Sequence, residues 1–261
     1  MFLATPGFLT PQSSGFDPDA LAYFTAAGIT DTTEKDAVNQ LVLDLKGTGS
    51  TTNNTNVWDD LYVVNPLSPT SLAAAAYNLK DPTRNITWFN SPTHATTGIS
   101  GNGTNMYGNL GYNPLTEGWD ESNIGLTYSG EYSNADFPLG CRVGVPFLAL
   151  RNQLNTKGSY ITSNSTVATS STTLRNITTG SRTSNTSHKI FTNGVEISEI
   201  TTTETEIMPN GDLFILGLNL NGSIFAAFAG EIDFTAVHKG LTDNQAKDLS
   251  DAITTYNTAA R

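Results

Sequence analysis

The sequence predicts a mainly β protein, a sandwich or jelly roll with helices only near its two ends. Between Trp58 and His238, many short runs rich in Val, Ile, Thr, Tyr and Phe are separated by Gly, Asn and Pro. Asn-Gly pairs at 193–194, 210–211 and 221–222 mark turns, and the first lies between two such runs, as in a β-hairpin. Many short strands with regular turn signals are typical of sandwiches and jelly rolls.

Two helices are expected before this region. Asp17 can cap the first helix, Pro18 suits its first position and Gly28 closes it. In the second helix, Asp31 and Glu34 have the spacing of a capping box. Its apolar residues recur every three or four positions and form one face to bury: Val38, Leu41, Val42 and Leu45.

A third helix is expected at 242–257, where Thr242 and Gln245 have the pattern of a capping box. Candidate strands lie at 61–64, 86–89, 124–128, 142–151, 158–162, 172–176, 189–192, 195–200, 212–218, 223–229 and 231–238. The Thr-, Ser- and Asn-rich stretch 162–187 fits polar-faced outer strands, because threonine suits a half-exposed pleated surface.

The composition excludes several classes of function. The chain has 13 Lys and Arg against 24 Asp and Glu, a net charge of -11, which argues against a nucleic-acid partner. No apolar run approaches the ~20 residues that span a bilayer, so we expect no membrane insertion. Cys141 is the one cysteine, and the three histidines lie far apart, so we expect no disulfide and no metal site built from Cys and His.

The first 16 residues are expected to form an extended arm. No basic residue precedes Lys35, and Pro6 and Gly7 interrupt the apolar run, unlike in a secretory signal. The arm can lie on its own domain or dock on a neighbouring subunit through Phe2, Leu3, Phe8 and Leu9. The expected organisation is an arm at 1–16, a helical lead-in at 17–49, and a β-sandwich at 50–261 closed by the helix 242–257.

The chain ends in a segment that resembles the close of laminin-G-like, concanavalin-A-like jelly-roll domains, GEIDFTAVHKGLTDNQAKDLSDAITTYNTAAR. A narrower set, the jelly-roll structural proteins of tailed-bacteriophage virions, resembles VWDDLYVV, AYNLKDP, ITWFNSPTHATTGISGNGTNMYGNLGYNP and FTNGVEI...MPNGDLFILGLNLNGS. In that set a helical lead-in of the type ITDTTEKDAVNQLVLDLK precedes the domain, as it does here. The resemblance covers roughly residues 20–261.

This resemblance implies a concanavalin-A-like jelly roll with two N-terminal helices and a C-terminal helix. It further implies a non-enzymatic virion structural protein, a capsid-decoration or tail-fibre component that displays a lectin-like domain. The expected partners are other virion proteins, further copies in a homo-oligomer, and host surface glycans, with assembly in the host cytoplasm. Two alternatives stay open: a carbohydrate-binding host-recognition adhesin, and a glycan depolymerase of the jelly-roll glucanase type.

Glu231 and Asp233 are the carboxylates that the depolymerase alternative would use. Alternate residues of a strand point to one face, so both can enter one groove. Jelly-roll endoglucanases carry E-x-D-x-E or E-x-D-x-x-E, in which the first Glu is the nucleophile and the last is the acid/base. Here Thr235 or Ala236 stands at the last position, so we expect a structural role and no catalytic residue.

Glu117, Asp120 and Glu121 form a second acidic cluster around Trp119. It is a candidate sugar site, in which the indole would stack on a ring and the carboxylates would accept hydroxyl hydrogen bonds. A Ca²⁺ ion, which takes six to eight oxygen ligands, is an alternative occupant, although no EF-hand spacing is present. A solvated turn is the third reading. His94 is the one histidine that we single out for ligand binding, and no other cofactor or metal is expected.

Overall fold

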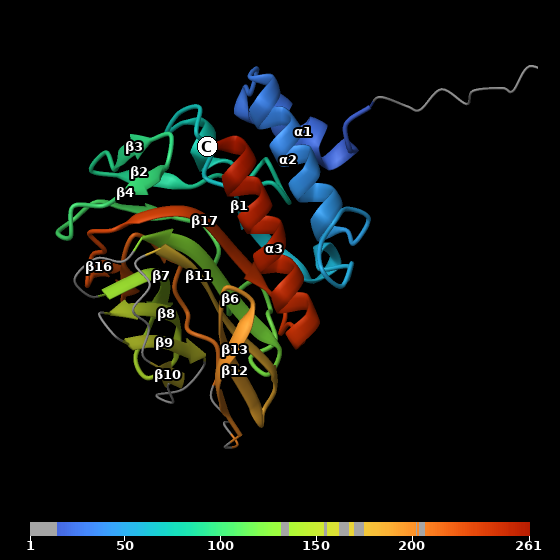
Figure 1. Cartoon of the computed structure of the whole chain (residues 1–261). Coiled ribbons are helices and arrows are strands. Elements are labelled where there is room, and N and C mark those ends of the chain that lie inside the picture. Colours follow the sequence, from blue (N-terminus) through green and yellow to red (C-terminus); the bar gives the residue numbers. More distant parts are fainter. Residues whose placement is uncertain are drawn as a thin grey trace, which may run out of the picture.

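The computed structural model describes residues 15–131, 136–153, 156–161, 167–169, 175–201, 203 and 207–261. These residues form a helical layer and two facing β-sheets (Figure 1). The helices are α1 (Pro18–Ala27), α2 (Thr32–Leu45) and α3 (Asp243–Ala260), and short 3-10 turns are η1 (Trp58–Asp60) and η2 (Ala74–Ala76). The expected mainly β sandwich with two N-terminal helices and one C-terminal helix is confirmed.

The first sheet has eight strands in the described part of the chain. Their order is β13-β12-β11-β6-β17-β4-β3, and β1 pairs with β17. The bounds are β1 (Leu61–Asn65), β3 (Thr93–Ala95), β4 (Gly98–Ser100), β6 (Ile124–Glu131), β11 (Arg175–Ser184), β12 (Ser187–Thr192), β13 (Val195–Ile200) and β17 (Glu231–His238). The last strand of the chain therefore lies inside the sheet, beside β6.

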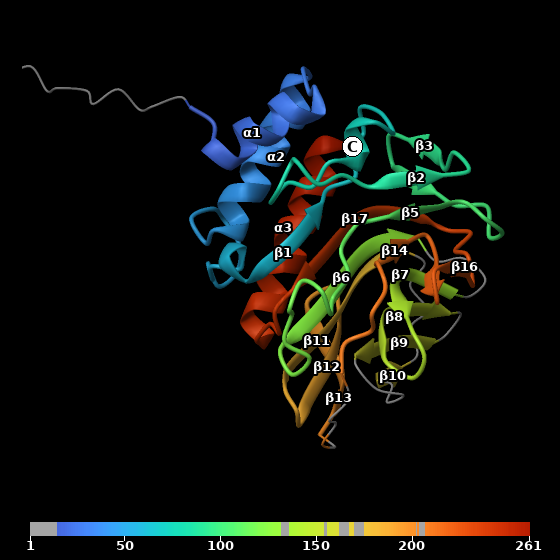
Figure 2. The ribbon, with the colours of Figure 1, turned by 180° about the vertical axis from the view of Figure 1, so that it is seen from behind.

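The second sheet has nine strands among the described residues, in the order β10-β9-β8-β7-β14-β5-β2, with β15 joined to β7 and β16. Figure 2 shows β5, β14, β7, β8, β9 and β10 following one another from behind. The bounds are β2 (Thr87–Phe89), β5 (Tyr107–Asn109), β7 (Asp136–Arg142), β8 (Phe147–Gln153), β9 (Thr156–Ile161), β10 (Val167–Thr169), β14 (Phe214–Ile215), β15 (Leu218–Leu220) and β16 (Ser223–Phe225).

The eight-stranded sheet is the middle layer, and its central strands β6, β11 and β17 are buried on both faces. Ile232 of β17 and Leu126 of β6 belong to the core between the sheets. Phe234 of β17 instead packs in one cluster with Leu41 of α2 and Ile253 of α3. Burying a Leu- or Phe-sized side chain contributes about 1.5–3 kcal/mol, so this second cluster fixes the helices to the sheet.

The ends of α1 and α3 follow the predicted caps. The Asp17 side chain accepts a backbone hydrogen bond at the start of α1, and Gly28 ends that helix with a φ of 68°. At α3, Thr242 and Gln245 make both hydrogen bonds of the capping box. The helix continues to Ala260, three residues beyond the expected end.

Glu34 has a different role from the one its spacing predicts. Asp31 caps α2 by accepting a hydrogen bond from the Glu34 backbone N–H at 2.9 Å. The Glu34 carboxylate, however, is only 2% exposed and accepts hydrogen bonds from the hydroxyls of Ser68 and Thr70. It therefore joins α2 to the segment that follows β1.

β11 corrects the expectation of polar outer strands at 162–187, of which 162–166 and 170–174 lie outside the described residues. This strand lies between β12 and β6 and is buried over most of its length. The Thr179 hydroxyl pairs with that of Thr127 at 2.9 Å, and Ser181 donates to the Leu241 carbonyl at 3.0 Å. Because these hydroxyls find partners, a Thr- and Ser-rich strand can occupy the centre of a sheet.

Lys157 of β9 is buried in the sandwich, with 1% of its surface exposed. Its ammonium group donates to the Asn176 side chain and, at 3.2 Å, to the Thr178 hydroxyl. Within the described part of the chain, no carboxylate pairs with it. Burial therefore lowers the pKa of Lys157 from 10.5 to about 8.

We expect the fold to become more stable as Lys157 loses its proton. Because its pKa is lower in the folded than in the unfolded chain, the folded chain binds fewer protons between about pH 8 and pH 10.5, and the free energy of unfolding rises across that window. The rise is about 3 kcal/mol for a shift of this size. Lys157→Met should remove it, so urea unfolding of both proteins should show a difference that changes with pH. A constant difference would contradict the buried, unpaired ammonium.

Candidate functional site

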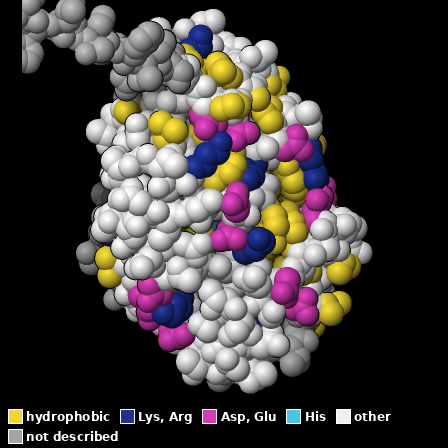
Figure 3. Space-filling model, turned by 90° about the vertical axis from the view of Figure 1, so that its right-hand side faces the viewer, with side chains coloured by type: hydrophobic (Ala, Val, Ile, Leu, Met, Phe, Trp, Pro, Cys, Tyr) yellow, Lys and Arg dark blue, Asp and Glu magenta, His cyan; other side chains and the backbone are white. Residues whose placement is uncertain are grey.

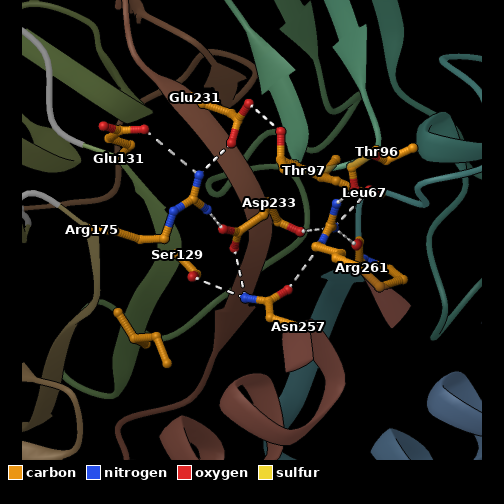
Figure 4. A network of polar contacts seen from close by, with 12 residues as sticks. Leu67, Thr96, Thr97, Ser129, Glu131, Arg175, Glu231, Asp233, Asn257 and Arg261 are labelled. Carbon is orange, nitrogen blue, oxygen red and sulfur yellow. Dashed lines mark hydrogen bonds and ion pairs between the residues drawn. The ribbon is translucent and has the colours of Figure 1, made fainter. Parts of the chain in front are cut away.

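Asp233 is buried at the centre of a charged network next to the C-terminal end of α3 (Figure 4). An irregularity in the pairing of β17 with β6 falls between Ile232 and Phe234, and the Asp233 side chain points toward the helix. It accepts hydrogen bonds from the Arg175 guanidinium of β11 and, at 2.9 Å, from the Asn257 amide of α3. The network therefore ties α3, β11 and β17 together.

Glu231, the other candidate carboxylate on β17, is held by the same guanidinium. It pairs with Arg175 and accepts a hydrogen bond from the Thr97 hydroxyl at 2.8 Å. Burial opposes the charge of Arg175, but the neighbouring acids outweigh it and raise the Arg175 pKa. Thr235 and Ala236, at the place of a glycosidase acid, are buried. Both carboxylates of this strand are therefore engaged by other side chains of the protein, and they do not form a free catalytic pair.

The carboxylates of the predicted acidic loop have separate surroundings. Glu117 is bound by Arg84, whose two terminal nitrogens donate to it at 2.7 and 3.1 Å. Asp120 accepts hydrogen bonds from the backbone and hydroxyl of Ser122, which is a local turn. Glu121 is exposed. The loop thus holds one ion pair and one turn.

Trp119 corrects the expectation of an exposed stacking platform. Its side chain is buried, with 8% of its surface exposed, in the core between the sheets. The indole stacks on the Tyr62 ring at 4.9 Å between centroids and lies 6.1 Å from the Tyr112 ring. It therefore anchors the loop and does not offer a face to a sugar.

His94 lies apart from this loop. It is on β3 and pairs with Ile99 of β4, which in turn pairs with Ile232 near the start of β17. The acidic loop instead joins the end of β17, where the Asn123 side chain accepts a hydrogen bond from the Gly240 N–H. At ~3.3 Å per residue, the strand separates them by roughly 20 Å. The structure does not bring the two together.

Three further expectations concern parts of the chain away from these residues. The arm residues Phe2, Leu3, Phe8 and Leu9 lie outside the described residues. Of the helices described, none is long and apolar enough to cross a membrane. Where the structure describes the chain, no three His, Cys, Asp or Glu side chains gather as they would to hold a metal ion.

A groove of about 490 Å³ lies on the outer face of the second sheet, beside β5, β14 and β15. Gly108 of β5 faces the core residues Ile86 and Trp88, so the neighbouring side chains Tyr107 and Asn109 point outward. The polar lining consists of five asparagines and one aspartate, Asn109, Asn113, Asn210, Asn219, Asn221 and Asp212. No Lys, Arg or His is among the described lining residues.

Backbone groups fix the orientation of these amides. Asn109, Asn219 and Asn221 each accept a backbone N–H hydrogen bond through Oδ1, at 2.7, 2.7 and 3.3 Å. Asn113 does the same at 3.2 Å, and its Nδ2 donates to Asn210 Oδ1 at 2.9 Å. An amide whose oxygen is bound in this way has a defined direction for its NH₂ group. The groove is therefore lined by amides of fixed orientation.

Asp212 is the one ionisable side chain of the described lining. Its Oδ2 accepts a hydrogen bond from Asn109 Nδ2 at 3.0 Å, and its backbone carbonyl accepts one from Asn219 Nδ2 at 2.7 Å. Its Oδ1 has no partner among the described residues. This oxygen is thus the acceptor left for a ligand.

An aromatic ladder continues the groove across three strands. Phe214 of β14, in the groove lining, stacks on Tyr107 of β5 with 4.6 Å between the ring centroids. Tyr107 stacks in turn on Phe89 of β2, also at 4.6 Å, and Phe89 is 38% exposed. Small-ligand sites combine apolar and aromatic surface with a few placed polar groups, as this surface does.

The sequence alone does not point to this groove. The Asn-Gly pairs at 210–211 and 221–222 indicate only turns, and Asn109 lies 103 residues from its partner Asp212. The available signal was the density of asparagine around these two turns. It indicates a polar surface but does not show that β5 brings Asn109 to it.

No protein-family model matches the sequence, and no curated protein matches it. Among solved structures, the chain is similar to a Trypanosoma rangeli sialidase in complex with 2,3-difluorosialic acid, with a TM-score of 0.57 and 10% identity over 83% of this chain. It is also similar to a botulinum neurotoxin serotype D binding domain, with a TM-score of 0.53 and 10% identity over 74% of this chain. The chain spans 38% of the sialidase chain and 52% of the neurotoxin domain. These similarities show the fold, a lectin-like β-sandwich.

We expect Arg175→Gln to destabilise the fold, because Asp233 keeps only Asn257 as a partner. The free energy of unfolding should fall by about 2–3 kcal/mol, since the remaining charge is buried. Glu117→Gln, which removes the exposed charge pair with Arg84 and leaves the Arg84 contacts with Gly111 and Tyr112, should cost less than about 1 kcal/mol. Urea unfolding of both variants measures the difference. Equal losses would contradict the structural role of the network.

Proposed function

We propose that this chain is a non-enzymatic, carbohydrate-binding, lectin-like domain whose binding site is the groove at Asp212. One observation carries the proposal: a groove of oriented amides and one carboxylate continues into a ladder of stacked aromatic rings. Sugars present hydroxyl groups together with apolar C–H faces, and this surface matches both. Its volume of about 490 Å³ is in the range of small-ligand sites, ~300–1,000 Å³.

The charge distribution supports a neutral ligand over a polyanion. The chain carries a net charge of -11. Figure 3 shows one face, on which basic and acidic side chains lie next to each other within a largely uncharged surface. A nucleic-acid backbone needs a concentration of Lys and Arg, and the groove lining contains none where it is described.

The state of the β17 carboxylates supports binding without cleavage. A retaining glycosidase needs two carboxyl groups about 5–5.5 Å apart, one of them as the acid/base. Glu231 and Asp233 both bind Arg175, and Thr235 and Ala236 carry no carboxyl group. We therefore include the absence of glycan cleavage in the proposal.

The segments that resemble virion proteins of tailed bacteriophages, taken in their order along the chain, support a location for the domain. We propose that it is displayed on the outside of a tailed-bacteriophage particle, as a decoration or tail-fibre component. Many copies on one particle would bind a glycan surface with useful avidity even if each groove binds weakly. A host-recognition adhesin would use the same groove.

A glycan array probed with the full chain tests the groove. Asn221→Gly should weaken binding about tenfold, because it removes one oriented amide while glycine keeps the left-handed turn, where Asn221 has a φ of 52°. Asn54→Gly is the matched control, since Asn54 also has a φ of 52° and lies near α3, on the helical side. Equal binding by wild type and Asn221→Gly would contradict the site, and no binding by wild type would contradict the function.

Purified particles test the location separately. Mass spectrometry of particles from a culture that produces this chain should detect it, and electron cryo-microscopy should place it on the shell or on the tail. Particles without the chain would contradict display on a virion and would leave the glycan test unaffected.

A further inference from the structure

We infer that the groove selects neutral sugars that carry an acetamido group. This inference rests on the proposed function and names the ligand class of the same groove. The inference is based on the hydrogen-bonding atoms of the groove. Some of them already have partners within the protein, and the others are left to bind a ligand.

The amide oxygens of the groove are all engaged within the protein. Four asparagines accept backbone N–H groups through Oδ1, and Asn210 accepts the Asn113 amide. Among the described residues, Asn210 and Asn221 have no partner for Nδ2. An NH₂ group is a donor only, so these two side chains each direct a donor to the ligand.

Asp212 Oδ1 supplies the complementary acceptor. An acetamido group has one carbonyl oxygen, which can accept from an asparagine NH₂, and one N–H, which can donate to this carboxylate. Its methyl group can contact the half-buried Val143, an apolar part of the lining. A sugar with a hydroxyl group in place of the acetamido group can meet the donor or the acceptor with that hydroxyl, but it has no second polar atom and no methyl group at the same position.

The same atoms disfavour acidic sugars. The described lining has no cation to pair with a carboxylate or sulfate, and Asp212 would repel one at short range. Binding through a bridging Ca²⁺ is disfavoured as well, because that ion takes six to eight oxygen ligands, and the described lining offers one carboxylate and amide oxygens that already accept hydrogen bonds. A neutral acetamido sugar satisfies both constraints.

Calorimetric or NMR titration of the full chain tests this selectivity with four free sugars. N-acetylglucosamine and N-acetylgalactosamine should bind about tenfold more tightly than glucose and galactose, the difference that one hydrogen bond to a charged group supplies. N-acetylneuraminic acid, which carries the same acetamido group beside a carboxylate, should bind more weakly than the neutral acetamido sugars, most clearly at low salt.

Asp212→Asn should reduce the preference for acetamido sugars about tenfold. Asn109 would hold the oxygen of the new amide in place of Asp212 Oδ2, so an NH₂ donor would replace the free acceptor. Asp36→Asn, an exposed position on α2, changes the net charge equally and should leave the preference intact.

The possible outcomes distinguish the proposed function, carbohydrate binding, from the proposed selectivity for acetamido sugars. Binding of none of these sugars, together with an empty glycan array, would overturn the proposed function. Equal binding of acetamido sugars and plain hexoses, or tighter binding of the acidic sugar, would overturn the selectivity while leaving the carbohydrate site in place. An unchanged preference in Asp212→Asn would also overturn it.

Discussion

The burial of both faces of the central strands of the eight-stranded sheet is the constraint on which the rest of the structure depends. β17 lies in the middle of that sheet, and it contributes Ile232 to the core between the sheets and Phe234 to the core under the helices. A strand with two buried faces needs partners on each side, and α2 and α3 supply those partners on the helical side. The buried Asp233 is tolerable in this position because Arg175 and Asn257 compensate it.

This layering determines where a ligand can bind. The helices cover the outer face of the first sheet, and the second sheet covers its inner face, so the outer face of the second sheet is the broad β surface left. Its strands β2, β5 and β14 are only two or three residues long. The chain therefore enters turns close together there, and asparagines held by the backbone of these turns gather beside the stacked rings of Phe214 and Tyr107. The groove therefore results from the short strands of the second sheet, on the face of the sandwich that the helices do not cover.

The sequence predicts the parts of this architecture that depend on local patterns. The caps at Asp17 and Thr242 and the apolar stripe of α2 follow from spacing along one helix. The predictions that fail are those that depend on contacts between residues far apart in the sequence. The sequence of β11 predicts an outer strand, because a strand rich in hydroxyl groups is typical of a solvated surface. The Thr179 hydroxyl is instead hydrogen-bonded to that of Thr127, 52 residues away. The acidic residues around Trp119 suggest a sugar-binding platform, but its indole is buried and stacks on Tyr62.

The abundance of asparagine and threonine, about a quarter of the chain, serves more than solubility. In β11 these side chains close hydrogen bonds inside the protein, and in the groove they are held by backbone N–H groups from their own turns. An amide oriented by the backbone loses little conformational freedom when a ligand arrives, so more of each hydrogen bond appears as affinity. A charged side chain on a flexible stem would need to be ordered first. Low charge and high amide content are therefore what a surface selective for neutral polar ligands requires.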